Sequence, residues 1–387
     1  MCLGTEFVRF EERDDGVVAW LRDSQGATRT VQANYLIGCD GNRSDVREAL
    51  GIGRQGLGII QITRSVLFRA EELERYRRSG IGQWEIQQPG FEAFVAGYGD
   101  GRWVLMFHDD VDRDPASLAA AIQRAIGTPT PAEILSTGRW ELTALIADRF
   151  RKGRVFLAGD AAHTLPPTRG GYGANTGIAD AFNLSWKFAA VLSGQSKSSL
   201  LDSYEEERRP IAWMRFQQTF ARPDYARYVD DTYRAVPLID PIAVELGELY
   251  RSSIIDGATS DLPLALRPEE WRGQPGTRAP HRAVMRDGKP SSTLDLYGDG
   301  WVLVSSSETW CEAAVHLSER RGIRVSPINV RALLGPDEGA LVARDLGIGN
   351  HGASLVRPDG VIAWPSRDGY ADAEALERKM TSVAQLA

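Results

Sequence analysis

The residues best suited to chemistry lie in one stretch, from Gly153 to Gly177, where a short apolar run is followed by an acid and then by several glycines. Val155 to Ala158 is flanked by glycines and predicts a strand buried on both faces, which places Asp160 at its carboxyl end. The glycines that follow are Gly170, Gly171, Gly173 and Gly177. A carboxylate there suits a ligand hydroxyl, and glycine-rich backbone before a helix offers N–H groups to a negative charge or a carbonyl-rich ring edge.

These glycines lead into a predicted helix that continues to Leu192. Apolar residues recur at positions 178, 181, 184, 188 and 191, which is the spacing of one helical face. The glycines therefore fall just before this helix or within its first turn. On the pattern alone, an ordinary strand–loop–helix crossover with Asp160 as a helix cap is an equally good interpretation.

A second acid follows a second predicted strand. Residues 34–38 are apolar enough for a buried strand, and Asp40-Gly41 comes directly after it, before a short helix that ends near residue 50. Ser44 or Asn42 is expected to cap that helix. Taken by itself, Asp40-Gly41 favours a simple turn.

Together the two segments resemble a known enzyme family, the aromatic-ring hydroxylases, which are single-component flavoprotein monooxygenases similar to p-hydroxybenzoate hydroxylase. The second flavin-binding motif of that family resembles Gly159-Asp160, His163, Pro166-Pro167, the Gly-x-Gly-x-Asn of 171–175 and the run Asp180-Ala-x-Asn183-Leu-x-Trp186-Lys187. The family's other internal motif is similar to Cys39-Asp40-Gly41-x-x-Ser44-x-x-Arg47. Two motifs in the family's order are far more specific than either one alone.

The resemblance implies a FAD-dependent monooxygenase that uses NAD(P)H and O2 to hydroxylate a small aromatic substrate, phenolic or polyketide-like. It implies that Asp160 holds the ribityl chain, that Pro167 and the backbone of 171–175 face the flavin ring, and that Asp40 lies on the opposite wall. The cofactor-binding residues it implies are Asp40, Gly41, Arg47, Asp160, Pro167, Gly171, Gly173, Ala174 and Asn175. No catalytic acid or base is identified, and His163 is expected to support the loop through a hydrogen bond.

Members of the family open with a βαβ unit whose Gly-x-Gly-x-x-Gly turn seats the adenosine diphosphate. Two strings match this pattern, at 51–56 and 347–352, but both precede predicted strands instead of helices. We therefore expect the N-terminal Gly-x-Gly-x-x-Gly unit to be lacking and the FAD-binding domain to be truncated.

Composition narrows the class of protein. With 387 residues, 43% of them hydrophobic, and a net charge of -7, the chain is long enough for two or three domains and poorly suited to nucleic acid. It shows no long apolar run and no signal peptide, so we expect a cytoplasmic protein with no membrane segment. Cys2, Cys39 and Cys311 have neither disulfide nor metal-site spacing, and no metal is expected.

The expected fold is α/β with α+β elements, in which a truncated Rossmann-like FAD-binding domain is interleaved with a β-sheet substrate domain. Residues 1–58 form the first part of the FAD-binding domain, including an antiparallel meander of strands, and residues 59–145 form the substrate-binding sheet. Residues 146–262 complete the FAD-binding domain. Residues 263–387 form a thioredoxin-like domain, and the first part of this range overlaps a proline-rich linker expected at about 262–281.

Within the substrate-binding sheet we expect strands at 59–68, 83–87, 92–97 and 102–107, then a helix at 114–126. Its candidate pocket residues are Trp84, Phe91, Phe94, Trp103 and Met106, although packing inside the domain is the more usual role for any one of them. A long helix is expected at 200–220, and its charge run at 205–209 is interpreted as a solvated face.

The C-terminal part is expected to contain strands at 292–296, 301–305 and 323–330, helices at 309–320, 339–346 and 371–386, and a hairpin around Asp359-Gly360. Cys311 stands alone where thioredoxin carries two cysteines, so this domain is expected to be structural or to serve assembly. A homodimer is one such assembly. Two alternatives stay open: an inactive or accessory protein that cannot hold FAD, and a Baeyer–Villiger, epoxidase or cyclase reaction on the same scaffold.

Overall fold

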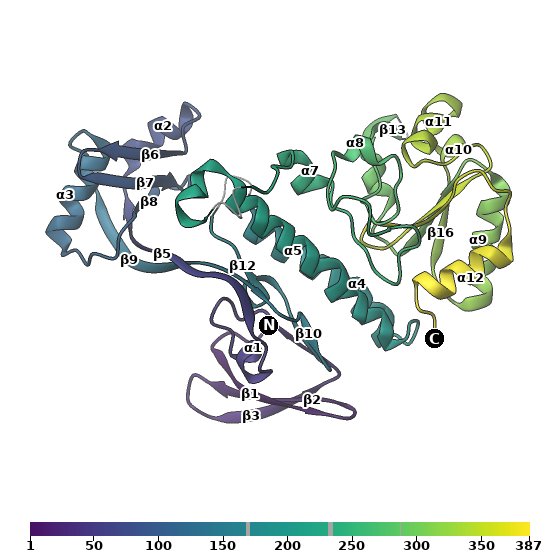
Figure 1. Ribbon diagram of the computed structural model, residues 1–387, viewed down its shortest axis with the longest axis horizontal. Helices are drawn as coiled ribbons and strands as arrows, with labels where there is room; N and C mark the ends of the chain where they lie inside the picture. Colours follow the sequence, from purple (N-terminus) through teal and green to yellow (C-terminus); the bar gives the residue numbers. More distant parts are fainter. Residues whose placement is uncertain (168–170, 231–234, 287) are drawn as a thin grey trace. The chain divides into compact units, whose positions relative to one another are not determined.

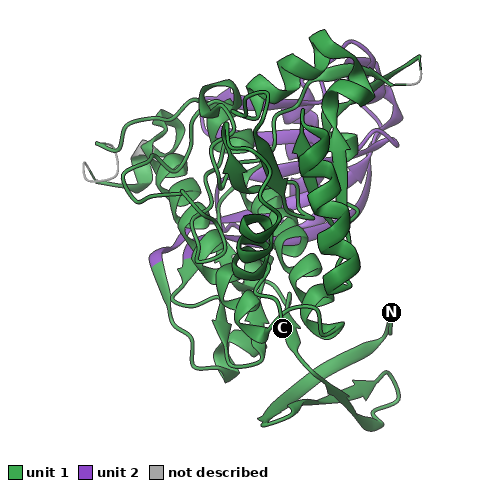
Figure 2. Ribbon diagram, turned by 90° about the vertical axis from the view of Figure 1, so that its right-hand side faces the viewer, with its two compact units in different colours: residues 1–55, 146–387 green, residues 56–145 purple. Residues whose placement is uncertain are grey.

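The computed structural model describes residues 1–167, 171–230, 235–286 and 288–387, and Figure 1 shows its elements in chain order. The fold is mixed α/β. The chain divides into two compact units, residues 1–55 together with 146–387, and residues 56–145 (Figure 2). Because the second unit is inserted between two parts of the first, elements far apart in the sequence meet in the first unit.

The first unit begins with the expected antiparallel meander, formed by β1 (Thr5–Arg13), β2 (Gly16–Asp23) and β3 (Thr28–Ala33). A second small sheet follows, with the strand order β10-β11-β4. In this sheet β4 (Leu36–Gly38) is parallel to β11 (Val155–Leu157), and β10 (Arg151–Lys152) is antiparallel to β11. All three residues of β11 are fully buried, as their apolar character predicts.

The inserted unit contains a sheet with the neighbour order β9-β5-β8-β7-β6. Its strands are β5 (Arg54–Arg69), β6 (Gln83–Gln88), β7 (Phe91–Gly97), β8 (Arg102–Phe107) and β9 (Glu133–Ala147). The long strand β9 was not predicted, because charged residues and a glycine interrupt its alternation. Helix α3 (Pro115–Ile126), which starts at the N-cap Asp114, buries Leu118 and Ile122 in the apolar cluster on one face of this sheet.

Helix α4 (Tyr172–Leu192) follows the glycine-rich loop, and its buried face differs from the predicted one. Ile178 is 69% exposed, whereas Asp180, Asn183 and Lys187 are almost completely buried. Leu184 and Phe188 of the predicted apolar face are buried, so the prediction was right in part. It missed the polar side chains because α4 lies against a helix that supplies charged partners for them.

That partner is α5 (Ser203–Ala221), and its charge run is not a solvated face. Glu207 is 1% exposed and Arg208 is fully buried. The interpretation of this run as solvated was therefore wrong for Glu207 and Arg208. Each is paired with a side chain of opposite charge, which is the usual condition for burying a charge.

The C-terminal sheet has the order β16-β15-β17-β18, with β15 parallel to β16 and antiparallel to β17. Its strands are β15 (Trp301–Ser305), β16 (Val325–Asn329), β17 (Ala353–Val356) and β18 (Ile362–Ser366). The helices around it are α9 (Glu308–Arg321), α10 (Val330–Leu334), α11 (Pro336–Asp345) and α12 (Ala373–Val383). A core that includes Leu303, Trp310 and Leu355 holds the sheet to α9 and α12.

Two expectations for this region need correction. Residues 293–296 form a turn of 3-10 helix instead of a strand, because Ser292 and Asp295 cap each other's backbone across that turn. The segment expected as a linker is packed and includes the short helix α8 (Pro268–Trp271). Trp271 is buried, and its ring nitrogen donates to the carbonyl of Gly247 at 2.8 Å.

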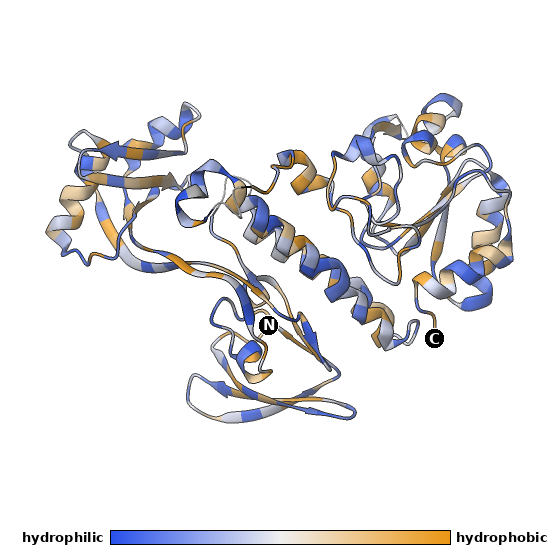
Figure 3. Cartoon of the chain, viewed as in Figure 1, coloured by the Kyte–Doolittle hydropathy of each residue, from blue (hydrophilic) through white to orange (hydrophobic). Residues whose placement is uncertain are grey.

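Among the residues that the structure describes, no helix has the length and apolar character needed to cross a membrane. Figure 3 shows hydrophilic residues recurring along both long helices, α4 and α5. In the same part of the chain, no cluster of three or more histidine, cysteine or acidic side chains is placed to hold a metal ion.

Candidate functional site

The two predicted motifs meet because their strands are adjacent. Leu157 of β11 lies beside Gly38 of β4 in a parallel register, and the amide of Ala158 donates to the carbonyl of Gly38 at 3.0 Å. The loops that carry Asp40 and Asp160 therefore leave the sheet at the same edge. The carboxyl edge of parallel strands is where α/β proteins bind their ligands.

Arg47 joins the two loops directly. Its guanidinium is buried and donates to the carbonyl of Ala161 at 2.9 Å and to the carbonyl of Asn42 at 2.9 Å. Burial lowers the pKa of Arg47 from its ordinary value. The sequence placed Arg47 in the site, and the structure adds that it ties the first loop to the residue after Asp160.

Asp40 is engaged by the protein itself. Its two carboxylate oxygens accept from the hydroxyl of Ser44 at 2.5 Å and from the amide of Val46 at 3.1 Å, at the start of α1 (Asp45–Ala49). Ser44 is the N-cap, one of the two residues that the sequence offered for this role. Gly41 has a φ of +81°, which a glycine adopts without strain. These contacts indicate that the Asp40 carboxylate shapes the loop.

Asp160 differs from Asp40 in having an unoccupied carboxylate. The side chain is exposed, and it makes no hydrogen bond or ion pair with any described residue. It follows β11 in the short 3-10 turn η2 (Gly159–Ala161), where no side chain caps the turn. Its acceptor oxygens are thus available to a ligand hydroxyl.

The start of α4 supplies the complementary donors. Gly171 is its N-cap in the left-handed conformation, with a φ of +61°, and no side chain caps the first turn. Gly171, Ala174 and Asn175 are exposed, and Gly173 is partly exposed. Because this helix has 21 residues, the amide groups of its first turn carry the positive end of a full helix dipole.

A glycine also lets α4 approach the strand end closely. A β-carbon added to Gly177 would lie 3.1 Å from the α-carbon of Gly159, which is too close for most side chains. Gly177 stands in the second turn of α4, not in or before its first turn as expected. Gly170 lies outside the described residues. The carbonyl of Pro167 accepts from the hydroxyl of Tyr225, whose pKa burial raises to about 12.

Sequence reasoning missed the group beneath this loop. Asp180 of α4 accepts from the amide of Gly159 at 3.1 Å, contacts Nε2 of His163 at 2.6 Å and accepts from Nε of Arg208 at 2.9 Å. Burial acts to raise the pKa of Asp180, but His163 and Arg208 outweigh it and hold that pKa below the usual range. The hydrogen bond expected of His163 is present, and its partner lies 17 positions away, where no spacing rule would find it.

The residues at this edge fit the flavin end of FAD. The free carboxylate of Asp160 matches a ribityl hydroxyl, and the uncapped amides at the start of α4 match a carbonyl-rich ring edge. The two strings that imitate a dinucleotide fingerprint do not contribute. The string at 51–56 runs into β5, which begins at Arg54, and the string at 347–352 precedes β17, so each leads into a strand instead of a helix, as predicted.

The structure also sorts the candidate pocket residues of the inserted unit. Trp103 is fully buried, and Trp84 and Phe91 pack against the same apolar cluster beneath α3. Phe94 and Met106 are cross-strand neighbours on the other face, in one row with Ser65. Trp140, which sequence reasoning missed, is 57% exposed and donates from its ring nitrogen to the Ser65 hydroxyl at 2.8 Å.

Comparison with known proteins gives consistent matches over almost the whole chain. A family described as FAD binding domain matches residues 2–219, and one described as aromatic-ring hydroxylase, C-terminal, matches residues 272–385. Aklavinone 12-hydroxylase of Streptomyces purpurascens is 38% identical to this chain over 391 residues, which is 96% of this chain and 71% of that protein. The 4-methyl-5-nitrocatechol 5-monooxygenase of a Burkholderia species is 36% identical over 401 residues, 96% of this chain and 72% of that protein.

A solved structure agrees with these matches. The ternary complex of aklavinone-11 hydroxylase with FAD and aklavinone superposes with a TM-score of 0.89 at 37% identity. The match covers 98% of this chain and 74% of that one.

Proposed function

The chain belongs to the aromatic-ring hydroxylases, a family of FAD-dependent monooxygenases, and from this we propose that it hydroxylates a polycyclic phenolic compound of the polyketide type. NAD(P)H is the reductant and O2 the oxygen source. Support for this substrate class comes from relatives named for aklavinone and tetracenomycin compounds. The observation that carries the proposal is the free carboxylate of Asp160 beside the uncapped start of α4.

Each proposed cofactor residue has a role that its surroundings allow. Asp160 accepts a hydrogen bond from the ribityl chain, and the backbone of 171–175, with Pro167 before it, faces the edge of the flavin ring. Asp40, Gly41 and Arg47 form the other wall. There Arg47 fixes the distance between the walls through its bond to Ala161.

When bound, FAD would be reduced by NAD(P)H and would then activate O2. The protein supplies position and electrostatics. Amide groups at the start of α4 favour negative charge on the ring edge, since they carry the positive end of the helix dipole and need no reorganisation to do so. No described side chain is proposed as an acid or base.

We propose that residues 59–145 bind the substrate through the sheet face that carries Phe94, Met106 and Trp140. These side chains are partly exposed and flat or flexible, which suits a planar aromatic ligand. Trp140 is held by Ser65, so its ring is presented in one orientation. The opposite face is filled by the packing under α3 and has no comparable role.

We further propose that residues 263–387 form a thioredoxin-like domain without dithiol chemistry, that the enzyme works in the cytoplasm, and that it forms a homodimer. The lone, buried Cys311 supports the first point. The pairing of β15 with one parallel and one antiparallel neighbour also suits a thioredoxin-like sheet.

The substrate proposal is tested by NAD(P)H oxidation in the presence of FAD, with aklavinone as the polycyclic probe and phenol as the single-ring control. We expect aklavinone to accelerate the oxidation and to yield a product one oxygen heavier by mass spectrometry. Acceleration by phenol alone would contradict the polycyclic substrate class. A product with a ring-inserted or epoxide oxygen would instead favour one of the alternative reactions.

A further inference from the structure

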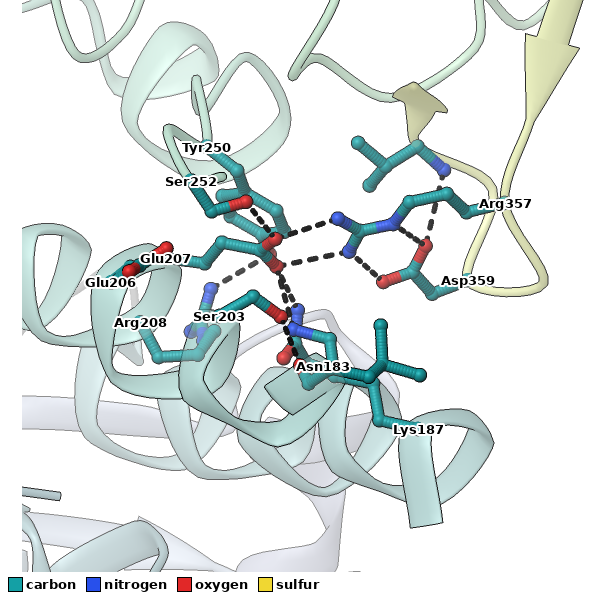
Figure 4. A network of polar contacts seen from close by, with 12 residues as sticks. Asn183, Lys187, Ser203, Glu206, Glu207, Arg208, Tyr250, Ser252, Arg357 and Asp359 are labelled. Carbon is teal, nitrogen blue, oxygen red and sulfur yellow. Dashed lines mark hydrogen bonds and ion pairs between the residues drawn. The ribbon is translucent and has the colours of Figure 1, made fainter. Parts of the chain in front are cut away.

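A buried ion cluster connects the C-terminal domain to α5 (Figure 4). Arg357 stands between β17 and β18, is fully buried, and donates from both terminal nitrogens to Glu207, at 2.7 Å and 3.0 Å. The second carboxylate, Asp359, accepts from Nε of Arg357 at 2.9 Å. The pairing of Arg357 with Glu207 is bidentate, which makes it directional as well as strong.

Glu207 is also the point where α4 is held. Its Oε2 accepts from Nδ2 of Asn183 at 2.6 Å and from Nζ of Lys187 at 3.1 Å, and its Oε1 accepts from the hydroxyl of Ser252 at 2.8 Å. Burial lowers the pKa of Lys187 to about 8. One carboxylate therefore receives donors from α4, from the loop before α8 and from the C-terminal domain.

The next residue of α5 faces the candidate flavin site. Arg208 donates to Asp180 at 2.9 Å and to the carbonyl of Thr176 at 3.3 Å, and Asp180 in turn accepts from the amide of Gly159. Two consecutive residues of α5 thus contact two different parts of the protein. Glu207 binds Arg357 of the C-terminal domain, and Arg208 binds Asp180, which holds the end of the strand before Asp160.

We propose that Arg357 is a positioning residue for the flavin loop. Its two bonds to Glu207 fix the rotation and depth of α5, so that Arg208 meets Asp180 and Asp180 holds the Gly159 amide at the end of β11. The C-terminal domain then contributes to the cofactor site without touching it. This inference rests on the proposed cofactor site at Asp160 and the start of α4.

The coupling is physically reasonable because the side chains of Arg357, Glu207, Arg208 and Asp180 are all buried, and the last link, to the Gly159 amide, is partly buried. Neighbouring residues of a helix share one hydrogen-bonded backbone, so a change in the orientation of Glu207 also moves Arg208. A buried carboxylate that loses one cation must move or take up a proton. If Arg357 is removed, Glu207 retains Lys187 and Asn183, both on α4, and is drawn toward them. We expect Arg208 to lose its alignment with Asp180, and the hydrogen bond from the Gly159 amide to Asp180 to break more often.

The test compares Arg357→Met with the unmodified protein in two measurements. The first is hydrogen exchange of the backbone amides in residues 155–165, without added ligand. The second is FAD affinity, from the quenching of flavin fluorescence. We expect faster exchange in that segment and a FAD dissociation constant about tenfold higher, the usual size of coupling between separate sites.

Two further variants separate positioning from general damage. Leu355→Ala removes a buried side chain of the same hairpin and should destabilise the same domain, but its side chain lies in the core formed with Leu303 and Trp310, to which no described residue of α5 belongs. We expect it to leave exchange at 155–165 and FAD affinity unchanged. Arg357→Lys keeps the positive charge but cannot form the bidentate pair with Glu207. We expect it to change amide exchange and FAD affinity in the same direction as Arg357→Met, but less.

Equal effects of Arg357→Met and Leu355→Ala would overturn the proposal, because both would then report only the loss of a folded domain. Unchanged exchange and affinity in Arg357→Met would overturn it as well. If Arg357→Met does not fold, Arg357→Lys decides, and no change in that variant contradicts the inference. A protein that binds FAD but oxygenates no aromatic compound would refute the proposed function, while the exchange result would still stand for Arg357.

Discussion

Asp40 and Asp160 lie in similar sequence contexts but make different contacts in the structure. Both follow a strand that was expected to be buried, and from the sequence both were expected at the cofactor. The strand β11 before Asp160 is fully buried, whereas β4 before Asp40 is only partly buried and its Ile37 is 42% exposed. The carboxylate of Asp40 accepts hydrogen bonds from Ser44 and Val46, whereas that of Asp160 has no partner among the described residues. The difference depends on the residues four and six positions after Asp40, whose contacts only the folded loop reveals.

Asp160→Ala should weaken FAD binding. A hydrogen bond to a charged acceptor contributes about 1.5–3 kcal/mol, so the dissociation constant should rise roughly ten- to hundredfold. Fluorescence titration with FAD measures this, and Asp160→Asn is the matched control because it keeps one acceptor oxygen. Unchanged affinity in Asp160→Ala would remove this residue from the cofactor site.

Helices α4 and α5 show, at the scale of elements, what the sequence could and could not predict. Both helices were predicted close to their observed bounds, since glycines, caps and apolar spacing are local signals. The polar part of their buried faces was missed, because the partners of Asp180, Lys187 and Glu207 lie from 17 to 150 positions away. A polar side chain that is buried with a distant partner looks like a surface residue in the sequence.

The pairing of α5 with the C-terminal domain predicts a pH dependence. Burial acts to raise the pKa of Glu207, but Arg357 and Lys187 outweigh it and hold that pKa well below its ordinary value. Below about pH 4.3 the unfolded chain binds a proton at this position and the folded chain does not. The free energy of unfolding should therefore decrease as the pH is lowered through this range, by up to about 1.4 kcal/mol per pH unit for this group.

Urea unfolding between pH 5 and pH 3 measures this slope. We expect Glu207→Gln to be less stable at pH 5 and to show a shallower fall than the unmodified protein. Glu206→Gln removes an exposed carboxylate from the same turn and serves as the control for the loss of one negative charge. Identical slopes in the unmodified protein and Glu207→Gln would show that this carboxylate is not responsible.

At the scale of the whole molecule, we propose that the two units have different roles. The first unit contains the proposed cofactor residues, from both sides of the insertion, and the inserted unit contains the proposed substrate face with Phe94, Met106 and Trp140. Family membership was correctly inferred from two short motifs. The role of the C-terminal domain could not be read in that way, because its connection to the flavin loop consists of contacts and not of a motif.

Cys311→Ser should leave NAD(P)H oxidation and product formation unchanged. Cys311 is buried, and burial raises the pKa of its thiol to about 11, so little reactive thiolate is present at neutral pH. Neither of the other two cysteines, Cys2 and Cys39, lies in the C-terminal domain to form a disulfide with it. Turnover by the folded variant checks this, and a loss of turnover would indicate redox chemistry in this domain.

We propose that the edge formed by β4, β11 and α4 holds FAD for the transfer of oxygen to an aromatic ring, and isotope labelling tests this proposal most directly. The protein is supplied with FAD, NAD(P)H and an aromatic substrate, once under 18O2 in ordinary water and once under ordinary O2 in labelled water. We expect a product with one 18O atom in the first experiment and none in the second. Label from water, or no oxygenated product while FAD is bound, would contradict it.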